Sequence, residues 1–197
     1  VVGLRWMTLQ LTDKEPRLEA LSGEIFASGP IDCDGGRLRQ LGSQLMERFG
    51  GDDQPTIIDD TTALEIPILG RIARNLLVIP LRSENQPLGI LYGGEKLDES
   101  HITTVDSKLC DSLANSLTIF LENMMLYGET QAMFLGTLHA LTSAIDAKDT
   151  YTHGHSERVA QMTRMLSEAV GLDAHTIDRV YLAGVVHDVG KIGVPEA

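Results

Sequence analysis

A long stretch in which turn residues are sparse places the strongest constraint on the fold of this 197-residue chain. From His101 onward, apolar residues recur at intervals of three and four, which is the spacing of one face of a helix. The series comprises Ile102, Val105, Leu109, Leu113, Leu117, Phe120 and Met124, and it continues through Tyr127, Phe134, Leu138, Leu141 and Ile145. The sequence therefore predicts one long helix, bent or broken at Gly128 or Gly136.

The residues before this helix predict antiparallel strands. Strand-like segments at 4–11 and 18–26 flank a turn that contains Asp and Pro, so a hairpin is the simplest arrangement. A short apolar run at 56–58 precedes two stronger runs at 76–81 and 88–92. These two runs flank a polar turn and predict a second hairpin.

A segment between the two hairpins carries the signals of a helix start and a helix end. Asp34 is placed as an N-cap, and the pair Gly50-Gly51 is placed to end the helix. The apolar residues between them share one helical face: Leu38, Leu41, Leu45 and Phe49. We expect this helix to lie on the sheet.

Charge and hydropathy exclude two kinds of partner. The net charge is −12, from 16 Lys and Arg against 28 Asp and Glu, so the chain lacks the basic patch that nucleic acid requires. The longest apolar run, Leu76 to Leu81, is far shorter than the roughly 20 residues that span a bilayer. Cys33 and Cys110 are too few for a disulfide framework and are interpreted as free thiols in a reducing cytoplasm. The chain begins at Val1 without an initiator Met, which we interpret as a cut within a longer protein.

The order of the predicted elements resembles the GAF family of sensor domains. The resemblance runs over residues 1–127 and ends in a helix that contains Leu121-Glu122-Asn123. It implies a GAF-like antiparallel sheet with flanking helices, whose first helix is expected before Val1. It also implies a small-molecule ligand, which the sequence does not identify. Cys33 has no adjacent His of the kind that often accompanies a bilin, and the NKFDE-type pattern of cyclic-nucleotide binders is not intact.

The residues that carry chemistry lie near the C-terminus. His187 and Asp188 follow an apolar helical segment at 177–186, and His155 opens the preceding helix. If the two helices pack antiparallel, His155 returns to the same place, and the set would suit Mn, Fe or Zn. Lys191, just past Gly190, could reach a phosphate oxygen. An isolated His-Asp pair, however, is more often a helix cap or a surface feature.

The longer strings around these residues resemble the HD-GYP subgroup of HD-domain phosphohydrolases. They are His155-Ser156-Glu157-Arg158-Val159 and His187-Asp188-Val189-Gly190-Lys191-Ile192-Gly193-Val194-Pro195. The resemblance covers about residues 137–197. It implies that His155, His187 and Asp188 are metal ligands, that Asp188 and Lys191 act in catalysis, and that cyclic di-GMP is the substrate. Some members place a Glu where this chain has Tyr151, so two divalent ions, Fe or Mn, are expected rather than three.

The chain stops at Ala197, before the GYP signature and the remaining ligands of that family. We therefore expect an incomplete catalytic site in this fragment, without activity and with weak metal binding or none. Two alternatives stay open. One is an HD phosphohydrolase of another class, acting on a nucleotide triphosphate or an alarmone. The other is a purely regulatory small-molecule-binding module with a degenerate output domain.

The remaining histidines carry weaker signals. His153 is a tempting extra ligand, but we interpret it as a loop residue. The others have no partner at ligand spacing and are interpreted as surface residues: His101, His139 and His175.

Together these patterns predict an α+β protein in three parts. Residues 1–127 form a GAF-like sensor domain, 128–148 a linker helix, and 149–197 the first helices of an all-α HD domain. The apolar residues of the long helix exceed one stripe, because Cys110, Leu121, Met125 and Leu126 lie on adjoining faces. A partner helix would cover the excess, so we expect a homodimer through the long helix.

Overall fold

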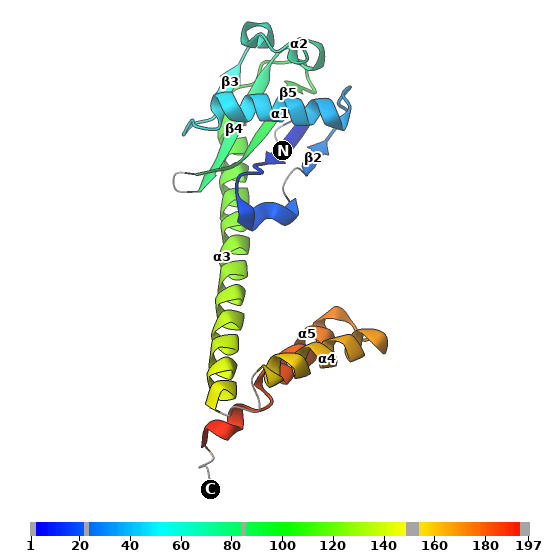
Figure 1. Ribbon diagram of the computed structural model, residues 1–197. Coiled ribbons are helices and arrows are strands. Elements are labelled where there is room, and N and C mark those ends of the chain that lie inside the picture. Colours follow the sequence, from blue (N-terminus) through cyan, green and yellow to red (C-terminus); the bar gives the residue numbers. More distant parts are fainter. Residues whose placement is uncertain (1–2, 22–23, 84–85, 149–153, 194–197) are drawn as a thin grey trace. The chain divides into compact units, whose positions relative to one another are not determined.

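The computed structural model describes residues 3–21, 24–83, 86–148 and 154–193, in two compact units (Figure 1). The first unit comprises residues 1–126 and the second residues 127–197. The strands are β1 (Leu4–Leu11), β2 (Ile25–Ser28), β3 (Thr56–Ile58), β4 (Leu76–Ser83) and β5 (Gln86–Lys96). The α-helices are α1 (Gly35–Phe49), α2 (Leu69–Ile72), α3 (Thr104–Lys148), α4 (His155–Ala169) and α5 (Ala174–Val186). Three 3-10 helices complete the list: η1 (Pro16–Leu21), η2 (Thr61–Leu64) and η3 (Val189–Gly193). The predicted α+β class is confirmed.

The first unit is built on a five-stranded antiparallel sheet with the order β2-β1-β5-β4-β3. The predicted second hairpin is the β4–β5 pair, in which Ser83 lies opposite Gln86. The first predicted hairpin also forms, but its second strand is shorter than expected. Only Ile25–Ser28 pairs with β1, and Pro16–Leu21 is a 3-10 helix. The Glu15 carboxylate accepts hydrogen bonds from the backbone N–H and the guanidinium of Arg17, and these local contacts favour a turn over an extended strand.

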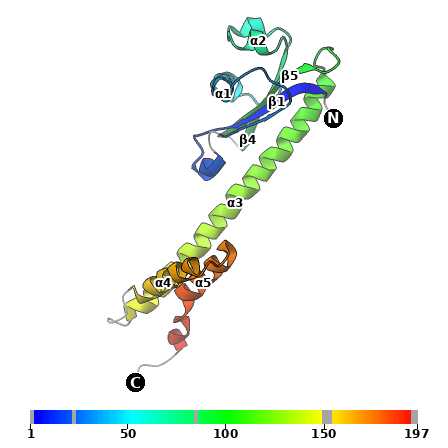
Figure 2. The ribbon, with the colours of Figure 1, turned by 90° about the vertical axis from the view of Figure 1, so that its right-hand side faces the viewer.

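Each face of this sheet is covered by different helices (Figure 2). On one face, α1 and α2 pack on a core that includes Trp6, Val78 and Tyr92. On the other face, the first part of α3 packs on a core that includes Ile79 and Leu91. The sheet is therefore buried on both sides, which explains why β4 and β5 read as nearly continuous apolar runs.

Helix α1 forms as its local signals predict. The Asp34 side chain caps the helix by accepting a hydrogen bond from the Arg37 backbone N–H. Gly50 closes the other end, with its N–H bonded to the Met46 carbonyl. The buried face includes Leu38, Leu41 and Leu45, and the helix lies on the sheet as expected.

Helix α3 runs without interruption through both glycines at which a bend or break was expected. Four of its apolar residues are buried against the sheet: Cys110, Ala114, Leu121 and Met125. Leu117 is partly buried beside them. A second set of apolar residues repeats at every seventh position and is exposed: Leu113, Phe120, Tyr127, Phe134 and Leu141. The helix thus carries more apolar surface than the sheet covers, which agrees with the excess seen in the sequence.

In the second unit, α4 and α5 form an antiparallel helical hairpin. Because the chain stops before the remaining helices of an HD domain, Leu182, Val185 and Val186 are expected to lack their normal cover. For Val185 this expectation is wrong, since it is only 1% exposed. The exposed apolar side chains of the hairpin lie instead on α4 and in the turn after it: Met162, Met165, Leu166, Val170 and Leu172. No helix among the described residues is long and apolar enough to cross a membrane.

Candidate metal centre

Close packing of α4 on α5 sets the geometry of the candidate site. Gly184 of α5 lies directly against Ala160 of α4, and a Cβ atom added to Gly184 would lie 2.7 Å from the Ala160 Cα. On one side of this contact Arg164 pairs with Asp178, and on the other side His155 approaches Asp188. The antiparallel crossing therefore brings the start of α4 to the end of α5.

Replacing Gly184 with Ala is expected to disturb this crossing. The added Cβ would meet backbone atoms of α4, so the helices must separate, at a cost of about 1–3 kcal/mol in unfolding free energy. Denaturant unfolding and manganese titration should both show the loss. Gly136→Ala is the matched control, since nothing lies within 4 Å of a Cβ there and α3 should gain up to about 1 kcal/mol. Equal unfolding free energies for the two variants would contradict the proposed crossing.

Three predicted ligands meet at this end of the hairpin. His155, His187 and Asp188 each offer one ligand atom, and these atoms all lie within 4.8 Å of one another. Asp188 Oδ2 is 3.3 Å from His187 Nε2 and 3.9 Å from His155 Nε2. Two atoms that each lie about 2.1 Å from one ion can be at most about 4.2 Å apart. Both distances to Asp188 fit a shared ion, so these residues suit a divalent metal.

The hydrogen bond of His187 also fits a ligand role. Its Nδ1 lies 2.8 Å from the Gly184 carbonyl oxygen, and a carbonyl only accepts, so Nδ1 carries the proton. Nε2, on the side of Asp188, is then the ring nitrogen that is available to a metal ion. Histidine ligands of metals usually donate their other N–H in this way, which fixes the ring orientation.

Lys191 lies at the same site, bound to a ligand carboxylate. Its Nζ donates to Asp188 Oδ2 at 2.6 Å, and this hydrogen bond contributes most to holding the pKa of Asp188 below its usual value. The carboxylate is therefore in the ionised form that binds a cation. Lys191 must leave Asp188 before it can reach a phosphate, and its place in the short η3 helix leaves its side chain exposed for that movement.

The other histidines differ in their surroundings. His153 and Tyr151 lie outside the described residues. His101 and His175 are exposed, as expected. His139 is half-buried, so it lies at the surface as expected, but it also contacts Glu157 and Tyr181. The sequence gives little indication of these two contacts, because His139 merely follows Leu138 in the apolar series.

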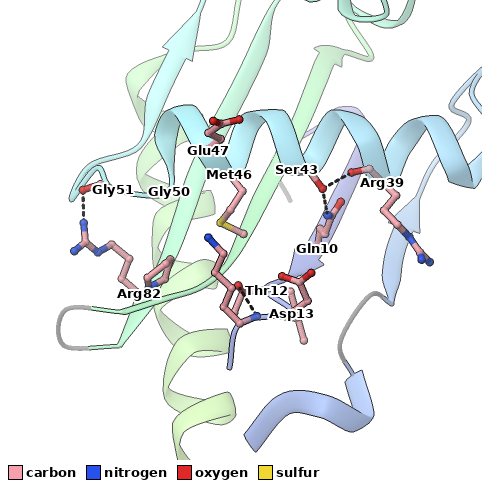
Figure 3. A pocket seen from close by; sticks show the side chains of 13 residues that line it. Gln10, Thr12, Asp13, Arg39, Ser43, Met46, Glu47, Gly50, Gly51 and Arg82 are labelled. Carbon is pink, nitrogen blue, oxygen red and sulfur yellow. Dashed lines mark hydrogen bonds between the residues drawn. The ribbon is translucent and has the colours of Figure 1, made fainter. Parts of the chain in front are cut away.

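A second candidate site is a cavity of about 830 Å³ in the first unit, between α1 and the sheet (Figure 3). Its wall includes the polar or charged residues Gln10, Lys14, Arg39, Ser43 and Glu47. The Gln10 amide donates to the Ser43 hydroxyl across this space. The volume lies in the range of small-molecule sites.

Comparison with known proteins gives a family match at the C-terminal end of the chain. An HD domain is present at residues 152–197, where the sequence matches the HD domain family model. The match spans His155, His187 and Asp188 of the candidate metal centre.

Three relatives from bacteria are similar over different shares of the chain. The 3'3'-cGAMP-specific phosphodiesterase 1 of Vibrio cholerae is 35% identical over 95% of this chain and 38% of its own length. Phosphodiesterase 2 of the same specificity and organism is 27% identical over 55% of this chain and 20% of its own length. A cyclic di-GMP phosphodiesterase of Thermotoga maritima is 29% identical over 36% of this chain and 19% of its own length. The chain thus spans less than two fifths of each of these relatives.

A solved structure is also similar in part. The GAF domain/HD domain protein of Geobacter sulfurreducens has a TM-score of 0.45 at 15% identity, covering 64% of this chain and 86% of that one.

Proposed function

We propose that this chain belongs to a metal-dependent phosphodiesterase that hydrolyses a cyclic dinucleotide under the control of a sensor domain. The convergence of His155, His187 and Asp188 within 4.8 Å carries this proposal. The HD domain match at these residues and the cyclic-dinucleotide phosphodiesterases among the relatives support it. We keep cyclic di-GMP as the proposed substrate, and the 35% identity to a 3'3'-cGAMP-specific relative favours 3'3'-cGAMP as the second candidate.

Each residue of the site would have a definite role in this reaction. His155, His187 and Asp188 would hold divalent ions, Mn or Fe, with Asp188 able to bridge two of them. Such ions, when bound, supply a hydroxide nucleophile and stabilise charge on the phosphoryl group. Lys191, which donates to Asp188 here and has an exposed side chain, would be the cation that reaches a phosphate oxygen of the substrate. Three protein ligands leave coordination positions for further ligands and for water.

The proposed organisation follows the predicted boundaries. Residues 1–127 would form the GAF-like sensor domain, 128–148 the linker helix, and 149–197 part of the HD-GYP-type domain. The cavity beside α1 supports a small-molecule ligand for the sensor, because its walls combine charged and hydrogen-bonding groups. The two thiols are free, in keeping with a reducing cytoplasm.

We also propose a homodimer through α3. The exposed apolar residues at positions 113, 120, 127, 134 and 141 repeat every seven residues, which is the period of a left-handed coiled coil. Met124, Leu138 and Ile145 each follow one of them by four residues, so they occupy the alternate positions of the same repeat. A second copy of the helix, with the same repeat, would cover this seam.

Hydrolysis by the full-length gene product tests the proposed activity. With manganese, we expect turnover of cyclic di-GMP or 3'3'-cGAMP that stops on chelation and returns when metal is restored, because the metal supplies the nucleophile. A nucleotide triphosphate and an alarmone should be turned over at least about 100-fold more slowly, a free-energy difference of about 2.7 kcal/mol. Faster hydrolysis of either of these would favour an HD phosphohydrolase of another class.

A further inference from the structure

A polar cluster in the second unit joins three helices at one carboxylate. Glu157 of α4 lies 3.2 Å from His139 Nδ1 of α3, measured to Oε2. Its other oxygen, Oε1, accepts a hydrogen bond from the Tyr181 hydroxyl of α5 at 3.5 Å. The Tyr181 hydroxyl also lies 3.3 Å from His139 Nε2. Each of the three side chains therefore contacts the other two.

The position of Glu157 gives this cluster a link to the candidate metal centre. Glu157 lies in the first turn of α4, two residues after His155. Tyr181 lies on α5, whose C-terminal end carries His187 and Asp188. The Arg164 guanidinium lies 5.5 Å from the centre of the Tyr181 ring and pairs with Asp178, which holds the ring in place.

We propose that Glu157 is the junction through which α3 sets the position of His155. His139 and Tyr181 are positioning residues in this arrangement, because they orient the Glu157 carboxylate and make no contact with the ligand atoms themselves. A shift or rotation of α3 moves His139, and the carboxylate then carries the movement to the first turn of α4. The inference rests on the proposed function and adds a route of regulation to it.

Loss of the His139–Glu157 contact is expected to change the orientation of His155 more than the free energy of unfolding. The side chains of His139 and Glu157 are 37% and 41% exposed, so the contact between them contributes at most about 1 kcal/mol to folding. Metal affinity, in contrast, depends on ligand orientation: loss of a partner bonded directly to a ligand typically costs 10–100-fold, and we expect the lower end of that range for partners that act through Glu157. A small movement of His155 would therefore be seen in metal binding before it is seen in unfolding.

Manganese titration of the full-length gene product, followed by electron paramagnetic resonance, tests the junction. His139→Ala is expected to raise the manganese dissociation constant about tenfold with little change in the midpoint of thermal unfolding. His139→Asn keeps an N–H donor near the place of Nδ1 and should stay within about threefold of the unaltered protein, which corresponds to about 0.65 kcal/mol. His175→Ala is the control, because it removes an exposed histidine from α5.

Tyr181→Phe provides a second variant that keeps the ring beside Arg164 and removes only the hydroxyl. It should weaken manganese binding in the same direction as His139→Ala. Unchanged affinity in both variants, or equal loss in His139→Ala and His139→Asn, would overturn the junction. If the unaltered protein binds no manganese, the proposed metal site itself is wrong and the junction fails with it.

Discussion

Replacing Asp188 with Ala is expected to remove both the bound metal and the hydrolysis of cyclic dinucleotides in the full-length gene product. Asp188 Oδ2 lies 3.3 Å from His187 Nε2 and 3.9 Å from His155 Nε2, so it is the shared neighbour of both imidazoles. Without it, only the two imidazoles remain, and an imidazole supplies no negative charge to balance that of the ions. We expect kcat/KM to fall by at least about 10³-fold, or about 4 kcal/mol in transition-state stabilisation.

A control removes a carboxylate elsewhere on the same hairpin. Glu168→Ala breaks an exposed pair with Arg164 within α4 and should leave metal content and turnover within about twofold of the unaltered protein. Metal content is measured by elemental analysis of the purified proteins, and turnover by separation of the linear product. Full metal occupancy in Asp188→Ala would rule out its assignment as a ligand.

Replacing Phe120 with Glu is expected to convert a dimer into a monomer. Phe120 is 59% exposed within the repeating seam on α3, so in a pair of helices it would contact its counterpart or a neighbour across the interface. Two like charges at such an interface cost several kcal/mol, and the dissociation constant should rise at least about 100-fold. Light scattering at micromolar concentration measures the change in mass.

Asn115→Glu serves as the matched control for charge on the same helix. Asn115 is exposed and lies outside the seven-residue repeat, so the added charge should leave the mass unchanged. Leu117 is a poor site for this test, because it packs partly on the sheet core and a charge there would disturb the first unit. A monomeric unaltered protein, or a Phe120→Glu protein that stays dimeric, would remove the case for the seam.

Elements with strong local signals could be predicted from the sequence. Helix α1 begins after Asp34 and ends at Gly50, as the cap and the terminating glycines indicated. The β4–β5 hairpin likewise follows from two apolar runs and a polar turn. Caps and turns depend on residues that are close together in the sequence, so they can be recognised without knowing the tertiary structure.

Two predictions of secondary structure were wrong, because local hydrogen bonds outweighed the pattern of apolar and turn residues. Residues 18–21 were predicted as part of the strand at 18–26, but they belong to the 3-10 helix Pro16–Leu21, since Glu15 binds the backbone and side chain of Arg17. Gly128 and Gly136 do not interrupt α3. A single glycine costs only about 1 kcal/mol in a helix, which the neighbouring hydrogen bonds of a long helix outweigh.

The sequence by itself determined the chemistry available at the metal centre, because the residue types and spacing of His155, His187, Asp188 and Lys191 are local properties of the chain. Only the tertiary structure decided that three of them meet, since their approach depends on the close crossing at Gly184 and Ala160. It also decided which face of α3 covers the sheet and brought His139 to Glu157. Such contacts join residues far apart in the chain, and periodicity describes the faces of a helix without saying what each face will contact.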